Sequence, residues 1–165
     1  MPRSRPKNAV KNRRRKQRTT QKRGTQKADR NSHNGATISN AQKSKFVKTF
    51  FEILHAIKLY HWKTKSYSQH QATDELHEKL SEQTDRFIEV LLGKNASRID
   101  MVEEKMRLYD FDHKHAFKDK IFEFRQFLID LDQIFQKKKD SDLLTIRDDM
   151  LEGVNQFLYL FTLSG

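Results

Sequence analysis

The chain of 165 residues contains no cysteine, and this absence excludes disulfide bonds and thiolate metal sites. It has only two prolines and five glycines, so helix breakers and residues suited to tight turns are scarce. No apolar run approaches the roughly 20 residues of a membrane span, and the first residues lack the apolar stretch of a secretory signal. We therefore expect a soluble, intracellular protein with no membrane contact, or one inside a particle assembled in a cell.

Charge is distributed very unevenly along the chain. Residues 1–45 hold fifteen Lys or Arg against a single acid, Asp29, and have no aromatic residue. Only three sizeable apolar side chains occur there, too few to offset the entropy lost on folding, so we predict a disordered basic arm. Residues 46–165 hold the other 18 basic and 21 acidic residues, a net charge of −3, and are predicted to form the folded domain.

The densest basic run of the arm is KNRRRKQR, Lys11–Arg18. Because no aromatic residue is available to stack on bases, the run favours contact with nucleic-acid phosphates without reading of the sequence. A nuclear localisation signal and a solubilising tail are the alternatives, and the pattern does not separate DNA from RNA. The residues predicted to bind nucleic acid are Lys11, Arg13, Arg14, Arg15, Lys16, Arg18, Lys22 and Arg23.

The rest of the chain has helical periodicity, with nothing that resembles a strand. Apolar residues at steps of three and four predict helices over about 44–64, 68–92, 115–137 and 140–161, with a short helix over 96–109. Ser68 and Gln71 are predicted to cap the second helix, and Asp140 or Ser141 the last. Four main helices with short connections predict an all-α four-helix bundle. The seam of the third helix is the most regular: Phe117, Ile121, Phe124, Leu128, Leu131 and Phe135.

The second helix carries a line of polar residues beside its apolar stripe. At 100° per residue, Asp74, Asp85 and Glu89 follow His70 at about 40°, 60° and 100°, while the apolar stripe lies near 310°. The pair of His70 and Asp74 is about 16 Å from the pair of Asp85 and Glu89, so one ion cannot bind both. An antiparallel two-fold dimer would bring unlike pairs together, and His61 could join them. The alternative is a solvent-exposed helix face without a metal.

These residues resemble the signature of the Dps family, the DNA-protecting ferritin-like proteins of starved bacteria. The signature has a His-Trp pair at the end of the first helix, matched by His61 and Trp62. It continues with a second His, an Asp four residues later and an Asp-x-x-x-Glu, matched by His70, Asp74 and the pair Asp85 and Glu89. The segment KKDSDLLTIRDDMLEGVNQFLYLF is similar to the last helix of the family. The turn between His61 and His70 is shorter than usual and lacks the usual glycine, which predicts a shifted His61.

The resemblance implies a ferritin-like bundle that binds DNA and oxidises iron. Ferrous iron would bind at a dimer interface, with His61, His70 and Asp74 from one chain and Asp85 and Glu89 from its partner. Trp62 would be a catalytic residue within reach of a radical, and the alternative is an aromatic residue of the core or of an interface. Assembly would be a homodimer or a larger homo-oligomer, located at the nucleoid or nucleus.

Two alternatives keep the bundle without iron chemistry. One is an architectural protein that packages nucleic acid, by itself or inside a virion, with the arm as the binding element. The other is a structural helical subunit of a larger particle.

Overall fold

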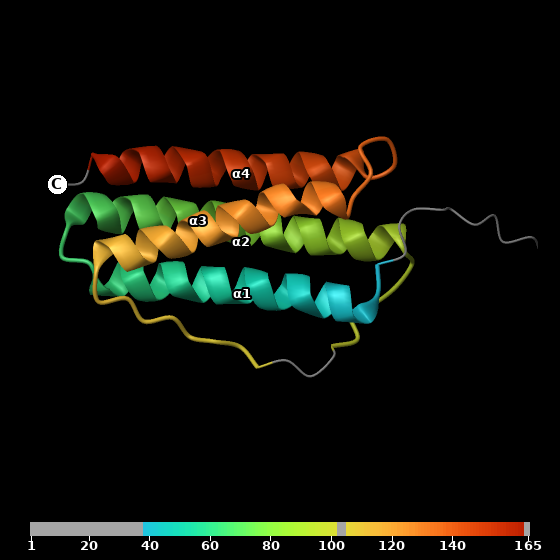
Figure 1. The fold of residues 1–165 in the computed structure, drawn as a ribbon, viewed down its shortest axis with the longest axis horizontal. Helices are drawn as coiled ribbons and strands as arrows, with labels where there is room; N and C mark the ends of the chain where they lie inside the picture. The colour runs from blue at the N-terminus through green and yellow to red at the C-terminus, as the bar shows by residue number, and fades with distance from the viewer. Residues whose placement is uncertain (1–37, 102–104, 164–165) are drawn as a thin grey trace, which may run out of the picture. The chain divides into compact units, whose positions relative to one another are not determined.

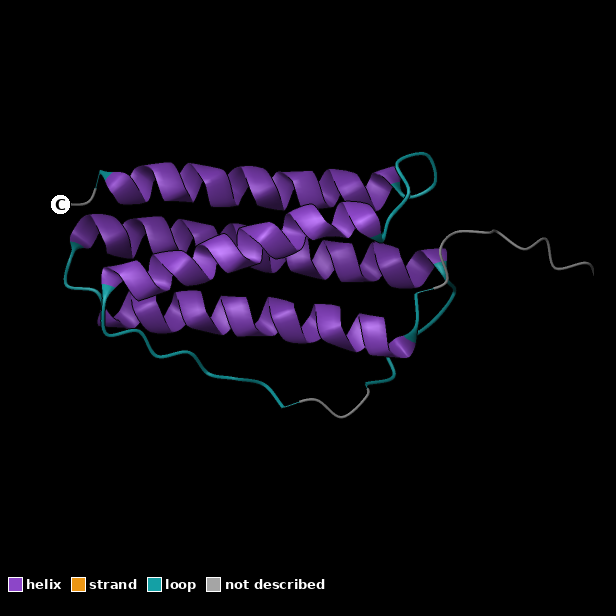
Figure 2. Cartoon of the chain, viewed as in Figure 1, coloured by secondary structure: helices purple, strands orange, loops and turns teal. Residues whose placement is uncertain are grey.

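The computed structural model describes residues 38–101 and 105–163, and in these two ranges every regular element is a helix (Figure 2). The helices are α1 (Asn40–Lys63), α2 (Tyr67–Lys94), α3 (Lys114–Asp130) and α4 (Ser141–Thr162). A single 3₁₀ turn, η1 (Leu131–Gln133), extends α3. The prediction of an all-α fold with four main helices is confirmed. None of the described helices is long and apolar enough to span a membrane.

The helices form a bundle in which each packs against two neighbours. α1 and α4 both contact α2 and α3, which gives the order α1, α2, α4, α3 around the bundle. α1 and α2 form an antiparallel hairpin, and so do α3 and α4, whereas α2 and α3 run in the same direction (Figure 1). The connection from α2 to α3 therefore returns along the bundle. One long crossover between two hairpins is the connectivity of ferritin-like bundles.

Phenylalanine is the most frequent residue among the buried hydrophobic residues. The predicted seam of the third helix is buried, as are Leu76, Leu80, Phe87 and Leu91 of α2. Phe50 meets Phe87 edge to face, with ring centroids 5.6 Å apart, and Tyr60 stacks on Phe117 at 3.9 Å. Edge-to-face pairs stabilise a core beyond the area that they bury, by about 0.5–1.5 kcal/mol each.

Helix α1 begins earlier than predicted, inside the segment that the sequence assigned to the arm. Ser39 is its N-cap: the Ser39 side chain accepts the Gln42 backbone N–H, and the Gln42 side chain accepts the Ser39 N–H. This capping box satisfies two donors that would otherwise lack partners. The remainder of the predicted arm, residues 1–37, lies outside the described residues.

The predicted capping box of Ser68 and Gln71 is wrong. α2 begins at Tyr67, and its N-cap Ser66 makes no side-chain cap bond. The earlier start places Gln69 where its side-chain oxygen accepts hydrogen bonds from Tyr60 at 2.8 Å and Thr64 at 2.7 Å. Contacts across the α1–α2 link therefore decide where α2 begins.

The predicted short helix over 96–109 is also wrong, because the described residues of this segment, 96–101 and 105–109, have no helical structure. An extended chain advances about 3.3 Å per residue against 1.5 Å in a helix, which suits a connection that must return along the bundle. The connection is held on α1 by hydrogen bonds, from Lys43 to Ser97 at 2.9 Å and from the Arg107 N–H to Glu52 at 2.8 Å.

Candidate functional site

Two histidines meet where α1 ends and α2 begins, and we call His61 and His70 the histidine pair. Their rings stack with centroids 3.8 Å apart at an angle of 24°. Nδ1 of His61 lies 3.1 Å from the carbonyl oxygen of His70, and Nδ1 of His70 lies 3.2 Å from the carbonyl oxygen of His61. The short turn predicted a shifted His61, but the structure holds this residue directly on His70, only 7% exposed.

These reciprocal bonds decide which ring nitrogens carry hydrogen. A carbonyl oxygen can only accept, so each Nδ1 must be the donor. In a neutral ring, Nε2 then has a free lone pair, which is the state in which histidine binds a metal. Thr73 supports the arrangement, because its hydroxyl donates to the Gln69 carbonyl at 2.8 Å and lies 3.3 Å from Nδ1 of His61.

Asp74 lies beside the histidine pair, as predicted. Its Oδ1 is 3.8 Å from Nε2 of His61 and 3.2 Å from Nζ of Lys58. The hydrogen bond from Lys58 lowers the pKa of Asp74, and the positive charge of Lys58 acts in the same direction. The carboxylate is therefore ionised at neutral pH and already has a cationic partner. Lys58 was not among the predicted site residues, although it precedes His61 by three residues and so lies on the same side of α1.

Asp85 and Glu89 lie further along α2 and are exposed. Eleven residues separate Asp74 from Asp85, which is about 16 Å along a helix. One chain therefore keeps the two predicted half-sites apart. Among the described residues, no three His, Asp or Glu side chains are arranged to hold a metal ion.

Trp62, the predicted catalytic residue, lies on the outer side of α1 with 68% of its surface exposed. Phe51 is also exposed, and it contacts the exposed His55 with ring centroids 6.4 Å apart. At 100° per residue, Phe51, His55 and Trp62 fall within about 40° of one another. We call these three residues the aromatic stripe. It follows the same outer face of α1 as Lys58.

The opposite end of the bundle carries a second polar cluster, which the sequence analysis did not identify. Its centre is Asp140, only 3% exposed, which precedes α4 as predicted. Its carboxylate does not cap α4 but accepts the Gln136 backbone N–H at 2.9 Å and lies 3.3 Å from Nζ of Lys94. Lys94 also donates to Asp142 at 2.8 Å and to the Lys139 carbonyl at 2.6 Å. Burial opposes the charge of Lys94, but the two carboxylates outweigh it and raise the pKa of Lys94.

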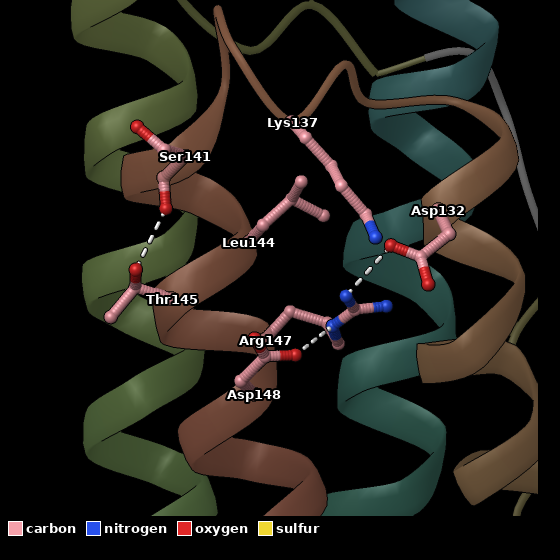
Figure 3. Close-up of a pocket in the computed structure, with 7 residues that line it drawn as sticks. All are labelled: Asp132, Lys137, Ser141, Leu144, Thr145, Arg147 and Asp148. Carbon is pink, nitrogen blue, oxygen red and sulfur yellow. Dashed lines mark hydrogen bonds and ion pairs between the residues drawn. The ribbon is translucent and has the colours of Figure 1, made fainter.

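Arg147 completes this cluster from the next turns of α4. It is 5% exposed and donates to the Leu128 carbonyl at 2.9 Å. It also donates to Asp132 at 2.8 Å and to Asp148 at 2.7 Å (Figure 3). The two carboxylates overcome the effect of burial and raise the pKa of Arg147. A surface depression beside it is lined by Lys137, Ser141 and Thr145, among other residues. The only signal in the sequence is an arginine at an inward position of the fourth seam.

The residues predicted to bind nucleic acid, Lys11 to Arg23, lie outside the described residues. The structure therefore does not test that prediction.

Comparison with known proteins gives one match. No curated protein and no solved structure is similar to the chain. A family model, described as a family of unknown function (DUF5856), matches residues 61–161. The match begins at His61 and includes α2, α3 and nearly all of α4, and so it covers the histidine pair, Asp74 and the cluster around Asp140, but not Lys58. Since it covers more than half of the chain, the protein belongs to this family of unknown function, DUF5856.

Proposed function

We propose that the protein is a Dps-like dimer that binds and oxidises ferrous iron on its α1–α2 face and holds DNA with its basic arm. The observation that carries the proposal is the histidine pair, whose reciprocal Nδ1 bonds leave both Nε2 atoms free beside an ionised Asp74. RNA is an alternative partner of the arm, because phosphate contacts do not distinguish the two.

The donor set fits iron. Imidazole nitrogen with carboxylate oxygen suits iron or a similar divalent ion, and the tethered Nδ1 atoms fix the orientation of both rings. Lys58 already neutralises Asp74, so an incoming cation would have to displace this ammonium group. Iron is then a substrate that competes with a built-in cation.

A second chain would complete the site. In an antiparallel two-fold pairing, His61, His70 and Asp74 of one chain would face Asp85 and Glu89 of its partner. The aromatic stripe supports this arrangement, since burying exposed aromatic side chains favours association. Trp62 would then lie at the interface, close to an oxidising centre, with peroxide as the oxidant that the family resemblance implies.

A second candidate is an architectural nucleic-acid-packaging protein, in a cell or a virion, with no iron chemistry. One observation favours it: the histidine pair is bonded to itself and Asp74 to Lys58, as in a purely structural cluster. In that case the bundle supplies dimerisation and spacing, and the arm supplies the binding.

The test compares two double variants of the full-length protein. His70→Ala/Asp85→Ala removes one predicted ligand from each half-site. His115→Ala/Asp119→Ala removes the same residue types from an exposed surface pair whose atoms are 2.9 Å apart. We expect anaerobic Fe²⁺ binding and peroxide consumption to fall at least about tenfold in the first variant, as for the loss of ligand support at metal sites, and to stay unchanged in the second.

Equal iron binding and oxidation in the wild type and His70→Ala/Asp85→Ala would remove the iron proposal. The architectural candidate would then remain. A wild-type protein that mass measurement shows to be monomeric would also contradict the shared site.

A further inference from the structure

Three consecutive lysines occupy the turn between η1 and α4, and we call Lys137, Lys138 and Lys139 the lysine turn. All three are exposed. Lys137 lies near Asp132 (Figure 3), and its charge helps to lower the pKa of that carboxyl, after the larger effect of the Arg147 hydrogen bond. Lys138 and Lys139 form no ion pair with any of the described residues. The turn therefore presents positive charge to solvent.

The backbone of the lysine turn is held firmly. The N–H groups of Lys139 and Asp140 both donate to the Gln136 carbonyl, at 3.0 and 2.8 Å. The buried Asp140 carboxylate accepts the Gln136 N–H, and Lys94 donates to the Lys139 carbonyl. A fixed backbone reduces the conformational freedom that binding must remove, so the turn is preorganised for a partner.

The acidic residues around the turn form their ion pairs with two other cations. Lys94 pairs with Asp140 and Asp142, and Arg147 pairs with Asp132 and Asp148. Neither cation belongs to the lysine turn. Each of these two internal cations has two carboxylate partners, whereas Lys138 and Lys139 pair with no carboxylate of the described residues and can meet an external anion.

The lysine turn lies at the end of the bundle where α1 begins (Figure 1). Two hydrogen bonds connect that end: the first turns of α1 contact the segment after α2 through Lys43 and Ser97, and Lys94 at the end of α2 contacts the turn itself. The strongly basic residues 1–45 lead directly into α1. The start of α1 and the lysine turn therefore lie at the same end of the bundle.

We propose that the lysine turn is a second nucleic-acid contact, which binds phosphates of the polymer that the arm also holds. This inference rests on the proposed function for the identity of the partner. The turn exposes no aromatic side chain, so it would contact the backbone without reading bases. Each lysine that neutralises a phosphate makes binding more sensitive to salt.

The experiment measures how the affinity of the full-length protein for duplex DNA changes with salt. Lys137→Gln/Lys138→Gln/Lys139→Gln should lower the slope of log K against log salt by about 2–3, because each phosphate contact contributes about 0.9. The matched control is Lys65→Gln/Lys79→Gln/Lys118→Gln, which changes the net charge equally on other parts of the bundle. The control should keep the wild-type slope, and replacing the lysine turn by three arginines should restore it.

An unchanged slope in the glutamine variant of the lysine turn would overturn the inference. So would a loss of binding to vesicles of anionic phospholipid without a loss on DNA, which would identify a membrane surface as the partner.

A full-length variant, Arg13→Gln/Arg14→Gln/Arg15→Gln, separates this inference from the proposed function. If the arm variant keeps wild-type affinity and the lysine-turn variant loses affinity, DNA binding by the arm is contradicted and the inference about the lysine turn is supported. If the arm variant loses affinity and the lysine-turn variant keeps it, only the inference about the lysine turn is contradicted. A wild-type protein that does not bind duplex DNA contradicts both.

Discussion

The polar side chains at the two ends of the bundle have different kinds of partner. Where α1 meets α2, the histidine pair uses its own backbone carbonyls as partners, and Lys58 pairs with Asp74. Where α3 meets α4, Lys94 and Arg147 hold four carboxylates between them. Both ends mix charges of both signs, but they leave different groups free.

This difference shows that internal pairing, and not composition, decides what each end can bind. At the histidine end, the groups left over are nitrogen lone pairs, which suit a cation. At the lysine end, the groups left over are ammonium groups, which suit a polyanion. Three predictions test how much the side chains at each end contribute to the unfolding free energy.

The largest effect is expected from Arg147→Ala at the lysine end. The change removes a buried side chain and leaves the Leu128 carbonyl and Asp132 without their donor, which should cost about 2–3 kcal/mol of unfolding free energy. Urea denaturation measures the loss. Arg125→Ala is the matched control, because Arg125 bonds the exposed Asn155 side chain at the surface; it should cost less than about 1 kcal/mol. Equal losses would mean that Arg147 does not hold this end together.

A smaller loss of unfolding free energy is expected at the start of α1, and almost none at the start of α2. Ser39 caps α1 at the lysine end with its side chain, whereas Ser66 precedes α2 at the histidine end without such a bond. Ser39→Ala should therefore lower the unfolding free energy by about 1 kcal/mol and Ser66→Ala by almost nothing. Thermal and urea unfolding of both variants measures the difference, and a larger loss in Ser66→Ala would contradict the assignment of the caps.

The smallest effect concerns pH at the histidine end. Burial lowers the pKa of His77, and the charge of Lys58 adds to this, while Asp74 opposes it. The folded state thus keeps His77 neutral at a pH where the unfolded chain, with a histidine pKa of about 6.5, takes up a proton. The unfolded state then binds more protons, so the contribution of His77 to stability is complete above about pH 6.5 and declines as the pH falls below it.

His77→Gln should remove that decline. At pH 8 the difference in unfolding free energy between wild type and variant sets the reference value. At pH 5 the wild type should have lost more unfolding free energy than the variant. Urea titrations across this range measure it. A difference that does not change with pH would show that His77 titrates equally in the folded and unfolded chain.

Much of the fold could be predicted from the sequence, because helical periodicity is local. The seam from Phe117 to Phe135 is buried as predicted, and α4 begins after Asp140 as predicted. The errors lie where local pattern competes with distant contacts. The segment 96–109 has helical spacing, but its described residues form no helix, and two hydrogen bonds hold them on α1.

The candidate site also has features that the sequence predicted and features that it could not. Spacing and resemblance predicted that His61, His70 and Asp74 belong together, and the structure brings them into contact. The partner role of Lys58 and the tethering of both Nδ1 atoms could not be predicted, because they depend on how closely the α1–α2 turn brings the two backbones together. The histidine ligands, the iron and the dimer remain proposals.

By itself, the sequence determined the helical class, the apolar seams and the separation of a basic arm from a mildly acidic domain, since each follows from residue type and short-range spacing. The tertiary structure alone decided which charges are left for a partner. Lys94 and Asp142 are 48 positions apart in the chain, and Arg147 reaches Asp132 across 15. Only folding brings such groups within a few ångströms, where Lys94 and Arg147 each pair with two carboxylates, while Lys138 and Lys139 form no ion pair with any described residue.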